Sequence, residues 1–359
     1  MASRKKTIPT DVFPEDAALH HADDGAPGYT REKRGRDGHR YLDPAGGPLE
    51  DAAALARIEA LTIPPAWNDV WVCTDAGGHL QATGRDAKKR KVYRYHPRWS
   101  ERRNQLKFDR LRVFGAALPA IRARVAADLR RRTLDRDRVA AVAVELLQQT
   151  LIRIGNEQYA ARNQTFGLTT LRDEHVAATT GSLRFTFTGK SGRDHDLTVR
   201  DRRLAAAALK LSELPGHRLL QYVGDDGRPH ALHSEHVNDY LRDPTGLDFS
   251  AKDFRTWFGT VGAACWLLEQ DPPLTREEGQ KQNVGAIRHA AALLGNTPAT
   301  CRKYYVHPLI PEMNAEGSLG PALRRLVEQM PEEAEAGLHP KEAAVLSLLL
   351  GDEGGRGSA

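Results

Sequence analysis

The spacing of hydrophobic and polar positions changes near residue 100 of this chain. Before that point, short segments alternate apolar and polar residues between turns such as Asp-Gly and Pro-Ala-Gly-Gly, which predicts β-strands. The stretch DAAALARIEALTI is amphipathic with helical spacing, and the PPAW that follows predicts where this short helix stops. The first part of the chain is therefore predicted to be a small β-rich domain.

After residue 100, apolar residues recur at helical spacing, with Arg and Asp on the opposite side. One segment departs from this pattern: LRFTFTGKSGRDHDLTV alternates on both sides of a Gly-Lys-Ser-Gly turn, which predicts a β-hairpin. The chain is therefore predicted to be α+β. We expect a flexible N-terminal extension over residues 1–27, a β-rich domain over 28–103, a mainly helical domain over 104–345 and a C-terminal tail over 346–359.

Length and composition fit this division. A chain of 359 residues exceeds what one core usually organises, so two domains are expected. Hydrophobic residues make up 40% and charged residues 28%, as in ordinary soluble globular proteins. The formal net charge of +5 indicates an acidic partner, without choosing among nucleic acid, a membrane surface and an acidic protein.

The cysteines and the termini narrow the class further. Cys73, Cys265 and Cys301 are unevenly spaced and form no CxxC pair, which argues against a disulfide framework or zinc site and fits a reducing cytoplasm. The basic start MASRKKTIPT has no apolar run behind it, so no secretory signal is expected. The longest apolar stretches are short or interrupted by Glu, and we expect them in core helices instead of a membrane.

The Gly-Lys-Ser sequence at 189–191 superficially matches the end of a phosphate-binding P-loop. That motif requires a glycine five residues before its second glycine, and Arg184 occupies this position. The sequence also lies inside a predicted hairpin, whereas a P-loop joins a strand to a helix. We therefore expect no bound nucleotide, and no cofactor of any kind.

A dense run of positive charge covers residues 85–107, which contain ten Lys or Arg and two acids. One interpretation is a solvated edge strand, because lysine protects exposed sheet edges. The other is a nucleic-acid surface, in which cations neutralise phosphates while interleaved aromatic rings contact sugars or bases. The candidate DNA contacts are Lys88, Lys89, Arg90, Lys91, Tyr93, Arg94 and Tyr95, together with Tyr159 further along the chain.

Three isolated cations stand in unusual settings. Arg153 follows a strongly apolar helix, Lys190 occupies the hairpin tip, and Arg255 lies on an otherwise aromatic helix. Each has an ordinary structural explanation: a partnered charge, a solvated tip and an ion pair with a buried acid. Taken together, they suggest cations gathered around an anion, with a tyrosine downstream.

Six ordered motifs give the chain a family resemblance. From about residue 28 to about 345 it resembles the small type IB DNA topoisomerases of bacteria and poxviruses. The matching stretches are IPPAWNDVWV, HLQATGRDAKKRKVYRYH, IRIGNEQYAARNQTFGLTTLR, FTFTGKSGRDHDL, KDFRTW and LGNTPATCRKYYVHP. The resemblance implies a β-rich domain that clamps DNA and a helical catalytic domain of the tyrosine recombinase and topoisomerase IB type. It also implies the catalytic set Arg153, Lys190, Arg255, Asn296 and Tyr305.

The resemblance selects one of two adjacent tyrosines. In the family the nucleophile lies nine residues after the His or Asn of a G(H/N)TP turn, which is Tyr305 here, and Tyr304 is interpreted as a packing or surface ring. Asn296 stands where many relatives have His; an amide can donate a hydrogen bond to phosphate but cannot shuttle a proton, so we expect it to position the phosphate. Val92 stands where the poxvirus enzymes have Gln, so their sequence preference is not carried over.

The resemblance implies that Tyr305 attacks a phosphate of double-stranded DNA, giving a 3′-phosphotyrosyl enzyme and a free 5′-hydroxyl. Resealing by that hydroxyl would need neither ATP nor a metal ion. The implied enzyme is a monomer that closes around duplex DNA, in the cytoplasm at the nucleoid.

Two other functions remain open at this point. A tyrosine site-specific recombinase shares the chemistry, but recombinases usually carry His three residues before the second Arg, where this chain has Lys252, as topoisomerases do. The third candidate is a DNA-binding protein that keeps the fold without catalysis, and the complete five-residue set argues against it.

Overall fold

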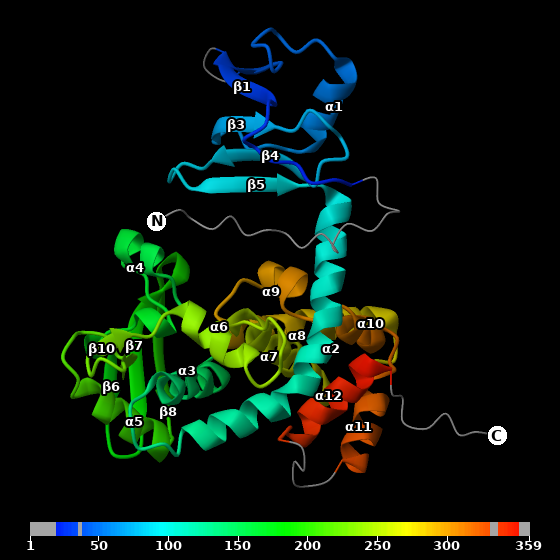
Figure 1. The fold of residues 1–359 in the computed structure, drawn as a ribbon. Coiled ribbons are helices and arrows are strands. Elements are labelled where there is room, and N and C mark those ends of the chain that lie inside the picture. The colour runs from blue at the N-terminus through cyan, green and yellow to red at the C-terminus, as the bar shows by residue number, and fades with distance from the viewer. Residues whose placement is uncertain (1–18, 35–37, 331–336, 352–359) are drawn as a thin grey trace. The chain divides into compact units, whose positions relative to one another are not determined.

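The structure is a computed structural model, and it describes residues 19–34, 38–330 and 337–351. Residues 1–18 of the predicted extension over 1–27 and residues 352–359 of the predicted tail over 346–359 therefore lie outside the described residues. The chain divides into two compact units, Met1–Lys107 and Phe108–Ala359, which are treated separately below (Figure 1). The predicted α+β class is confirmed: an antiparallel sheet near the N-terminus precedes a mainly helical part.

The first unit is built on a five-stranded antiparallel sheet with the strand order β2-β1-β3-β4-β5. Its strands are β1 (Tyr29–Arg34), β2 (Gly38–Leu42), β3 (Asn68–Val72), β4 (Leu80–Arg85) and β5 (Lys91–Tyr95). Helix α1 (Ala52–Ala60) begins at Asp51, whose carboxylate accepts hydrogen bonds from the backbone amides of Ala53 and Ala54.

The two faces of this sheet are covered by different parts of the chain. Ile58 of α1 packs with Val70, Val72 and Ala82 in one apolar cluster. Alternate residues of the strands form a second cluster with Ala22, which precedes the sheet in sequence. The predicted extension over 1–27 thus includes a described segment, residues 19–26, that lies against the sheet.

The second unit is mainly helical. Helix α2 (Pro97–Asp128) begins within the residues of the first unit and continues into the residues of the second. The other helices are α3 (Arg136–Thr150), α4 (Glu157–Asn163), α5 (Arg202–Ser212), α6 (Ser234–Arg242), α7 (Ala251–Leu268), α8 (Arg276–Leu294), α9 (Pro298–Tyr304), α10 (Leu309–Ala315), α11 (Leu319–Gln329) and α12 (Pro340–Leu350). Among the described residues, no helix combines the length and apolar character needed to cross a membrane.

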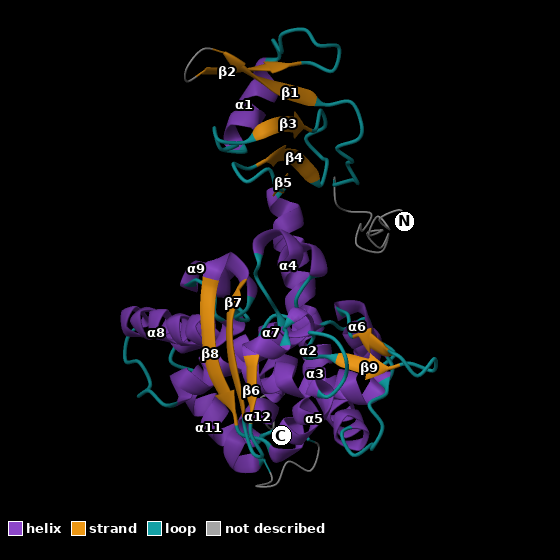
Figure 2. Cartoon of the chain, turned by 90° about the vertical axis from the view of Figure 1, so that its left-hand side faces the viewer, coloured by secondary structure: helices purple, strands orange, loops and turns teal. Residues whose placement is uncertain are grey.

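The predicted hairpin is confirmed as β7 (Leu183–Gly189) and β8 (Arg193–Val199), seen edge to edge in Figure 2. The prediction of only two strands in this unit was wrong. The structure adds β6 (Val176–Ala178) beside β7, and a separate pair, β9 (Gln221–Val223) and β10 (Pro229–Ala231). Each added strand has three residues, which is too short to show a period of two in the sequence.

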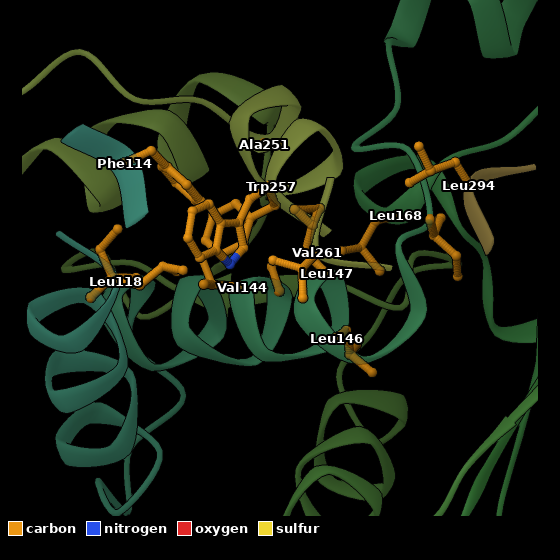
Figure 3. Close-up of a cluster of buried hydrophobic side chains, with 14 of the residues drawn as sticks. Phe114, Leu118, Val144, Leu146, Leu147, Leu168, Ala251, Trp257, Val261 and Leu294 are labelled. Carbon is orange, nitrogen blue, oxygen red and sulfur yellow. The ribbon is translucent and has the colours of Figure 1, made fainter. Parts of the chain in front are cut away.

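The core of the second unit surrounds the indole of Trp257 on α7 (Figure 3). Phe114 of α2 meets this ring edge-on, and Gly115 follows because a Cβ there would lie 2.4 Å from the indole. The Trp257 Nε1 donates a 3.1 Å hydrogen bond to Glu342 of α12, whose carboxylate also pairs with Arg122 of α2. One aromatic side chain therefore helps to fix α2, α7 and α12 against each other.

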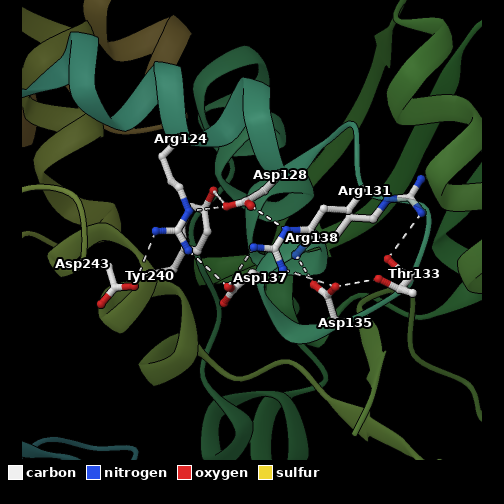
Figure 4. A network of polar contacts seen from close by, with 9 residues as sticks. All are labelled: Arg124, Asp128, Arg131, Thr133, Asp135, Asp137, Arg138, Tyr240 and Asp243. Carbon is white, nitrogen blue, oxygen red and sulfur yellow. Dashed lines mark hydrogen bonds and ion pairs between the residues drawn. The ribbon is translucent and has the colours of Figure 1, made fainter. Parts of the chain in front are cut away.

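A polar network joins the end of α2 to α3 and α6 (Figure 4). The buried carboxylate of Asp128 pairs with Arg124 at 2.5 Å and with Arg131 at 2.7 Å, and it accepts a 2.9 Å hydrogen bond from the Tyr240 hydroxyl. Burial, reinforced by this hydrogen bond, raises the pKa of Tyr240. Arg124 and Arg131 also reach Asp137 on α3, so the network fixes the helix that leads to Arg153.

Candidate active site

Arg153 lies in an extended segment directly after α3. The helix ends at Leu151, which adopts a left-handed conformation with φ 53°, and the chain then runs beside residues 167–169. The amide of Leu168 donates to the Arg153 carbonyl at 2.8 Å, and a Cβ on Gly167 would lie 2.5 Å from the same oxygen. The backbone of Arg153 is therefore held directly against residues 167 and 168, and only a glycine fits at position 167.

Lys190 lies at the tip of the β7–β8 hairpin and is exposed. The turn is tight because Ser191 and Gly192 both have positive φ, 69° and 73°. The Lys190 amine lies 5.9 Å from the ring centroid of Tyr159 on α4, within the range of a cation–π contact.

Arg255 projects from α7 and is 4% exposed. Its guanidinium donates to the carbonyls of Leu151 and Leu294, the latter at 2.5 Å, which lie at the C-terminal ends of α3 and α8. Burial, reinforced by the nearby charge of Arg153 and opposed by Tyr305, lowers the pKa of Arg255 to about 10. The group stays protonated at neutral pH.

Asn296 lies in the turn between α8 and α9. Gly295 ends α8 with φ 59°, and the Asn296 amide donates to Ala291 at 3.0 Å, closing the helix end. Thr297 then caps α9, and Pro298 occupies its first turn. The Asn296 side-chain oxygen accepts a hydrogen bond from Arg153, which joins two segments more than a hundred residues apart.

Tyr305 follows the last residue of α9 and is half-buried. The guanidinium carbon of Arg255 lies 5.6 Å from the centroid of its ring. Its backbone carbonyl accepts a 3.3 Å hydrogen bond from Thr260 of α7, and a Cβ on Gly259 would lie 2.7 Å from that carbonyl. The absence of a side chain at Gly259 therefore lets the backbone of Tyr305 lie directly on α7.

Tyr304 is oriented differently. It is 40% exposed, and the amine of Lys303 lies 5.2 Å from its ring centroid. A cavity of about 440 Å³ is lined by Arg153, Lys190, Arg255 and Tyr305, and Tyr304 does not line it. The structure thus brings four of the five predicted catalytic residues to one cavity, while Asn296 lies behind Arg153.

The two arginines of this cavity, Arg153 and Arg255, donate to neutral oxygens. In the described part of the chain, no carboxylate lies within ion-pair distance of Arg153, Lys190 or Arg255. Burial lowers the pKa of Arg153, and Arg193 adds to this effect. Among all residues that the structure describes, no group of three or more His, Cys, Asp or Glu side chains is arranged to hold a metal ion.

The predicted DNA contacts other than Tyr159 lie in the first unit, at the β4–β5 hairpin. Asp86 organises the turn that carries Lys88, Lys89 and Arg90: its carboxylate accepts hydrogen bonds from the backbone amides of Lys88 and Arg90, both at 2.9 Å, and from the Arg90 side chain at 2.7 Å. Lys89 has a φ of 58°. The turn therefore presents an exposed basic tip.

Strand β5 divides the remaining candidates between its two faces. Lys91, Tyr93 and Tyr95 share one face, where the two tyrosine rings stack with centroids 6.0 Å apart. Arg94 lies on the other face, over the Trp67 ring, and donates a 3.1 Å hydrogen bond to the Thr62 carbonyl. Val92, which shares that second face, is half-buried.

The face with Lys91 also carries an acid. Asp24, in the segment that precedes β1, lies 2.5 Å from the Lys91 amine and accepts a 2.9 Å hydrogen bond from the Thr83 hydroxyl. This pairing could not be predicted from the sequence, because the two residues are far apart and Asp24 lies in a stretch without periodicity.

Two side chains near the cavity were not singled out from the sequence, Arg193 and His195 on β8. Strand alternation could have placed both on the same face of the hairpin as Phe187, which packs into the core. Burial lowers the pKa of His195, and the charges of Arg193, Arg153 and Arg255 lower it further.

Comparison with known proteins identifies the family. The model of the eukaryotic DNA topoisomerase I catalytic core matches residues 96–315, and that of the bacterial DNA topoisomerase IB N-terminal domain matches residues 38–86. The chain therefore belongs to the type IB DNA topoisomerase family, which confirms the resemblance inferred from the motifs.

Viral relatives agree with this assignment. DNA topoisomerase 1B of Acanthamoeba polyphaga mimivirus is 31% identical over 259 residues, covering 70% of this chain and 77% of the relative. DNA topoisomerase 1B of Vaccinia virus (strain Copenhagen) is 24% identical and DNA topoisomerase I of Monkeypox virus is 27% identical, each over 288 residues that cover 77% of this chain and 85% of the relative.

Proposed function

We propose that this type IB DNA topoisomerase relaxes supercoiled duplex DNA through a covalent bond between Tyr305 and a 3′-phosphate. One observation carries the assignment of the nucleophile: the Tyr305 ring lies beside Arg255 in a cavity whose cations have only neutral partners among the described residues. Such a cavity favours binding of a phosphate diester, because the negatively charged phosphate can pair with cations that have no carboxylate partner among the described residues.

Each residue has a role that its position supports. The Tyr305 oxygen attacks the phosphorus and loses its proton to water, while the bond from phosphorus to the 5′-oxygen breaks. Arg153 and Arg255 stabilise the charge on the non-bridging oxygens, because their guanidinium groups are permanently charged and already held in place. Asn296, which lies behind Arg153, accepts a hydrogen bond from it and so helps to position that guanidinium, and its side-chain amide nitrogen is a further neutral donor. Lys190 gives a proton to the departing 5′-oxygen, from an exposed hairpin tip at the edge of the cavity.

The reverse reaction reseals the strand. The 5′-hydroxyl attacks the phosphotyrosine, its proton returns to the enzyme, and Tyr305 leaves. The covalent bond conserves the energy of the phosphodiester, so neither ATP nor a metal ion is required. Between the two steps the cut strand swivels and supercoils of either sign relax. We further propose that the enzyme acts as a monomer that clamps duplex DNA with its β-rich domain, in the cytoplasm at the nucleoid.

The test is plasmid relaxation in EDTA without ATP, combined with trapping of the DNA adduct and sequencing of the attached peptide. We expect relaxation by the full chain and an adduct on Tyr305. Tyr305→Phe should bind DNA without forming an adduct, whereas the matched control Tyr304→Phe should keep most of the activity.

Three results would contradict the proposal. An adduct formed by Tyr305→Phe would remove Tyr305 from its role. Activity that EDTA abolishes and magnesium alone restores would contradict metal independence, whereas modest stimulation by magnesium would not, since cations also screen DNA. Exchange between paired sites without relaxation would instead indicate a recombinase.

A further inference from the structure

One face of the β7–β8 hairpin, the face on which Phe187 packs into the core, carries Arg193 and His195. In the strand register Phe187 pairs with His195, and Gly189 pairs with Arg193. The His195 ring stacks on Phe187 with centroids 4.6 Å apart and an angle of 7°. A Cβ on Gly189 would lie 2.7 Å from His195 Nε2, so the imidazole fills the place of a side chain there.

Arg193 lies against the turn that carries Asn296. Its Nε and Cδ are 3.5 Å and 3.6 Å from the position that a Cβ on Gly295 would occupy, and the Cε1 of His195 is 3.6 Å from the same position. Arg193 does not line the cavity of Tyr305, although it lies beside the residue directly before Asn296. Its guanidinium is therefore next to the cleavage site without being part of it.

The charge of Arg193 is not neutralised within the described residues. No carboxylate there lies within ion-pair distance of it, and the two acids of the same strand are engaged elsewhere. Asp194 accepts a 2.8 Å hydrogen bond from Thr188, and Asp196 pairs with Arg184 at 2.7 Å, both on the opposite face of the hairpin. Arg193 also contributes to the lowered pKa of Arg153, so its charge extends to the catalytic cavity.

We propose that Arg193 binds a backbone phosphate of DNA adjacent to the scissile phosphate, with His195 holding the hairpin strand that carries it against the Gly295 turn. The inference rests on the proposed function, since the scissile phosphate is placed by Tyr305. Each strand of duplex DNA carries a phosphate at every nucleotide. An exposed arginine next to the site of the scissile phosphate is therefore close to the neighbouring phosphate of the same strand. An arginine can bind two of its oxygens at once.

The first test compares two arginines of the same hairpin. Arg193→Ala should weaken DNA binding severalfold and reduce the slope of log affinity against log salt by about one. Arg184→Ala is the matched control, because Arg184 is on the other face and already paired with Asp196. Its slope should equal that of the parent protein, and Arg193→Lys should restore most of the slope lost by Arg193→Ala.

The second test locates the phosphate. Single phosphates of a DNA duplex are replaced by neutral methylphosphonates, one position at a time, and binding is measured with Tyr305→Phe so that no cleavage occurs. At the contacted position, next to the scissile phosphate, the replacement should weaken DNA binding by Tyr305→Phe. It should cause no further loss of binding when Arg193→Ala is added to Tyr305→Phe. Thermal unfolding of each variant checks that the fold is kept, and Arg193→Gln replaces Arg193→Ala if the alanine variant unfolds.

The outcomes separate this inference from the proposed function. An unchanged salt slope in Arg193→Ala, or additive losses at every position, would overturn the phosphate contact while adduct formation on Tyr305 persists. Non-additivity at the scissile phosphate alone would also overturn it, because Arg193 would then act inside the cavity. Absence of a Tyr305 adduct in the parent would instead contradict the proposed function.

Discussion

Two clusters of cations among the described residues are held in opposite ways. On the β4–β5 hairpin of the first unit, carboxylates accompany them: Asp86 pairs with Arg90, and Asp24 pairs with Lys91. In the candidate catalytic cavity of the second unit, Arg153 and Arg255 donate to an amide oxygen and to backbone carbonyls.

This difference in the partners of the cations agrees with the roles proposed for the two clusters, DNA binding for the first and catalysis for the second. A surface cation paired with a carboxylate would exchange that partner for a phosphate on binding. The ion pair stabilises the free protein, and breaking it moderates the affinity for DNA. A cavity cation held by neutral oxygens keeps its full field, but burial disfavours its charged form and lowers the pKa of Arg255 to about 10. In the proposed mechanism a phosphate would stabilise that charge, most strongly when negative charge builds up during the reaction.

The largest effect should come from Lys190, the one predicted catalytic cation that holds no other element in place. Lys190→Ala should slow strand cleavage by roughly 10²–10⁴, the usual scale for proton transfer, with little change in DNA affinity. Single-turnover cleavage of a duplex with one scissile site measures the rate.

A sulfur substrate separates proton donation from charge. With sulfur in place of the bridging 5′-oxygen, the leaving group needs no proton, so cleavage by Lys190→Ala should recover, whereas cleavage by Arg255→Ala should not. If the sulfur substrate leaves Lys190→Ala slow, the lysine is not the acid. A loss below twofold would make Lys190 an ordinary solvated tip.

Asn296→Asp tests the comparison directly, because it places a carboxylate next to Arg153 with almost no change in shape. We expect single-turnover cleavage to fall by about 10²–10³, since the phosphate loses a donor and meets a negative charge. Asn296→Ala removes the donor without adding charge and is the matched control. Equal losses in both variants would mean that neutrality of the cavity is unimportant.

Asp24→Asn makes the opposite exchange on the candidate DNA-contact face of β5, and the smallest effect is expected there. Removing the acid should raise affinity for duplex DNA a few-fold at low salt and steepen the salt slope by about one, because Lys91 becomes available to a phosphate. Salt titrations of binding measure both quantities. Weaker binding by Asp24→Asn would show that the carboxylate orients Lys91 for DNA and does not compete with it.

Much of the fold could be predicted because its signals are local. Helical spacing marks the second unit, and the alternation around Gly189 to Gly192 gave the hairpin. The short strands β6, β9 and β10 were missed, because three residues are too few to show a period of two in the sequence. The contact of residues 19–26 with the sheet was equally invisible, since Asp24 and Lys91 meet only after folding.

The candidate site followed from motif spacing, which indicates which residues matter but not how they are held. The nine-residue interval from Asn296 to Tyr305 selects a tyrosine, and the structure places that ring beside Arg255. Spacing could not show that Arg255 donates to the carbonyls of Leu151 and Leu294, because these contacts join three separate helices.

Those two carbonyls have a consequence for how sequences of this family are interpreted. Arg255 ties the ends of α3 and α8 together, so its replacement would weaken the fold as well as the reaction. A descendant that had abandoned catalysis would therefore still be selected to keep an arginine at this position. Lys190 is free to drift under the same circumstances, because no described hydrogen bond or ion pair depends on it. When active and inactive members of the family are sorted by sequence, the hairpin lysine is thus the more informative of the two.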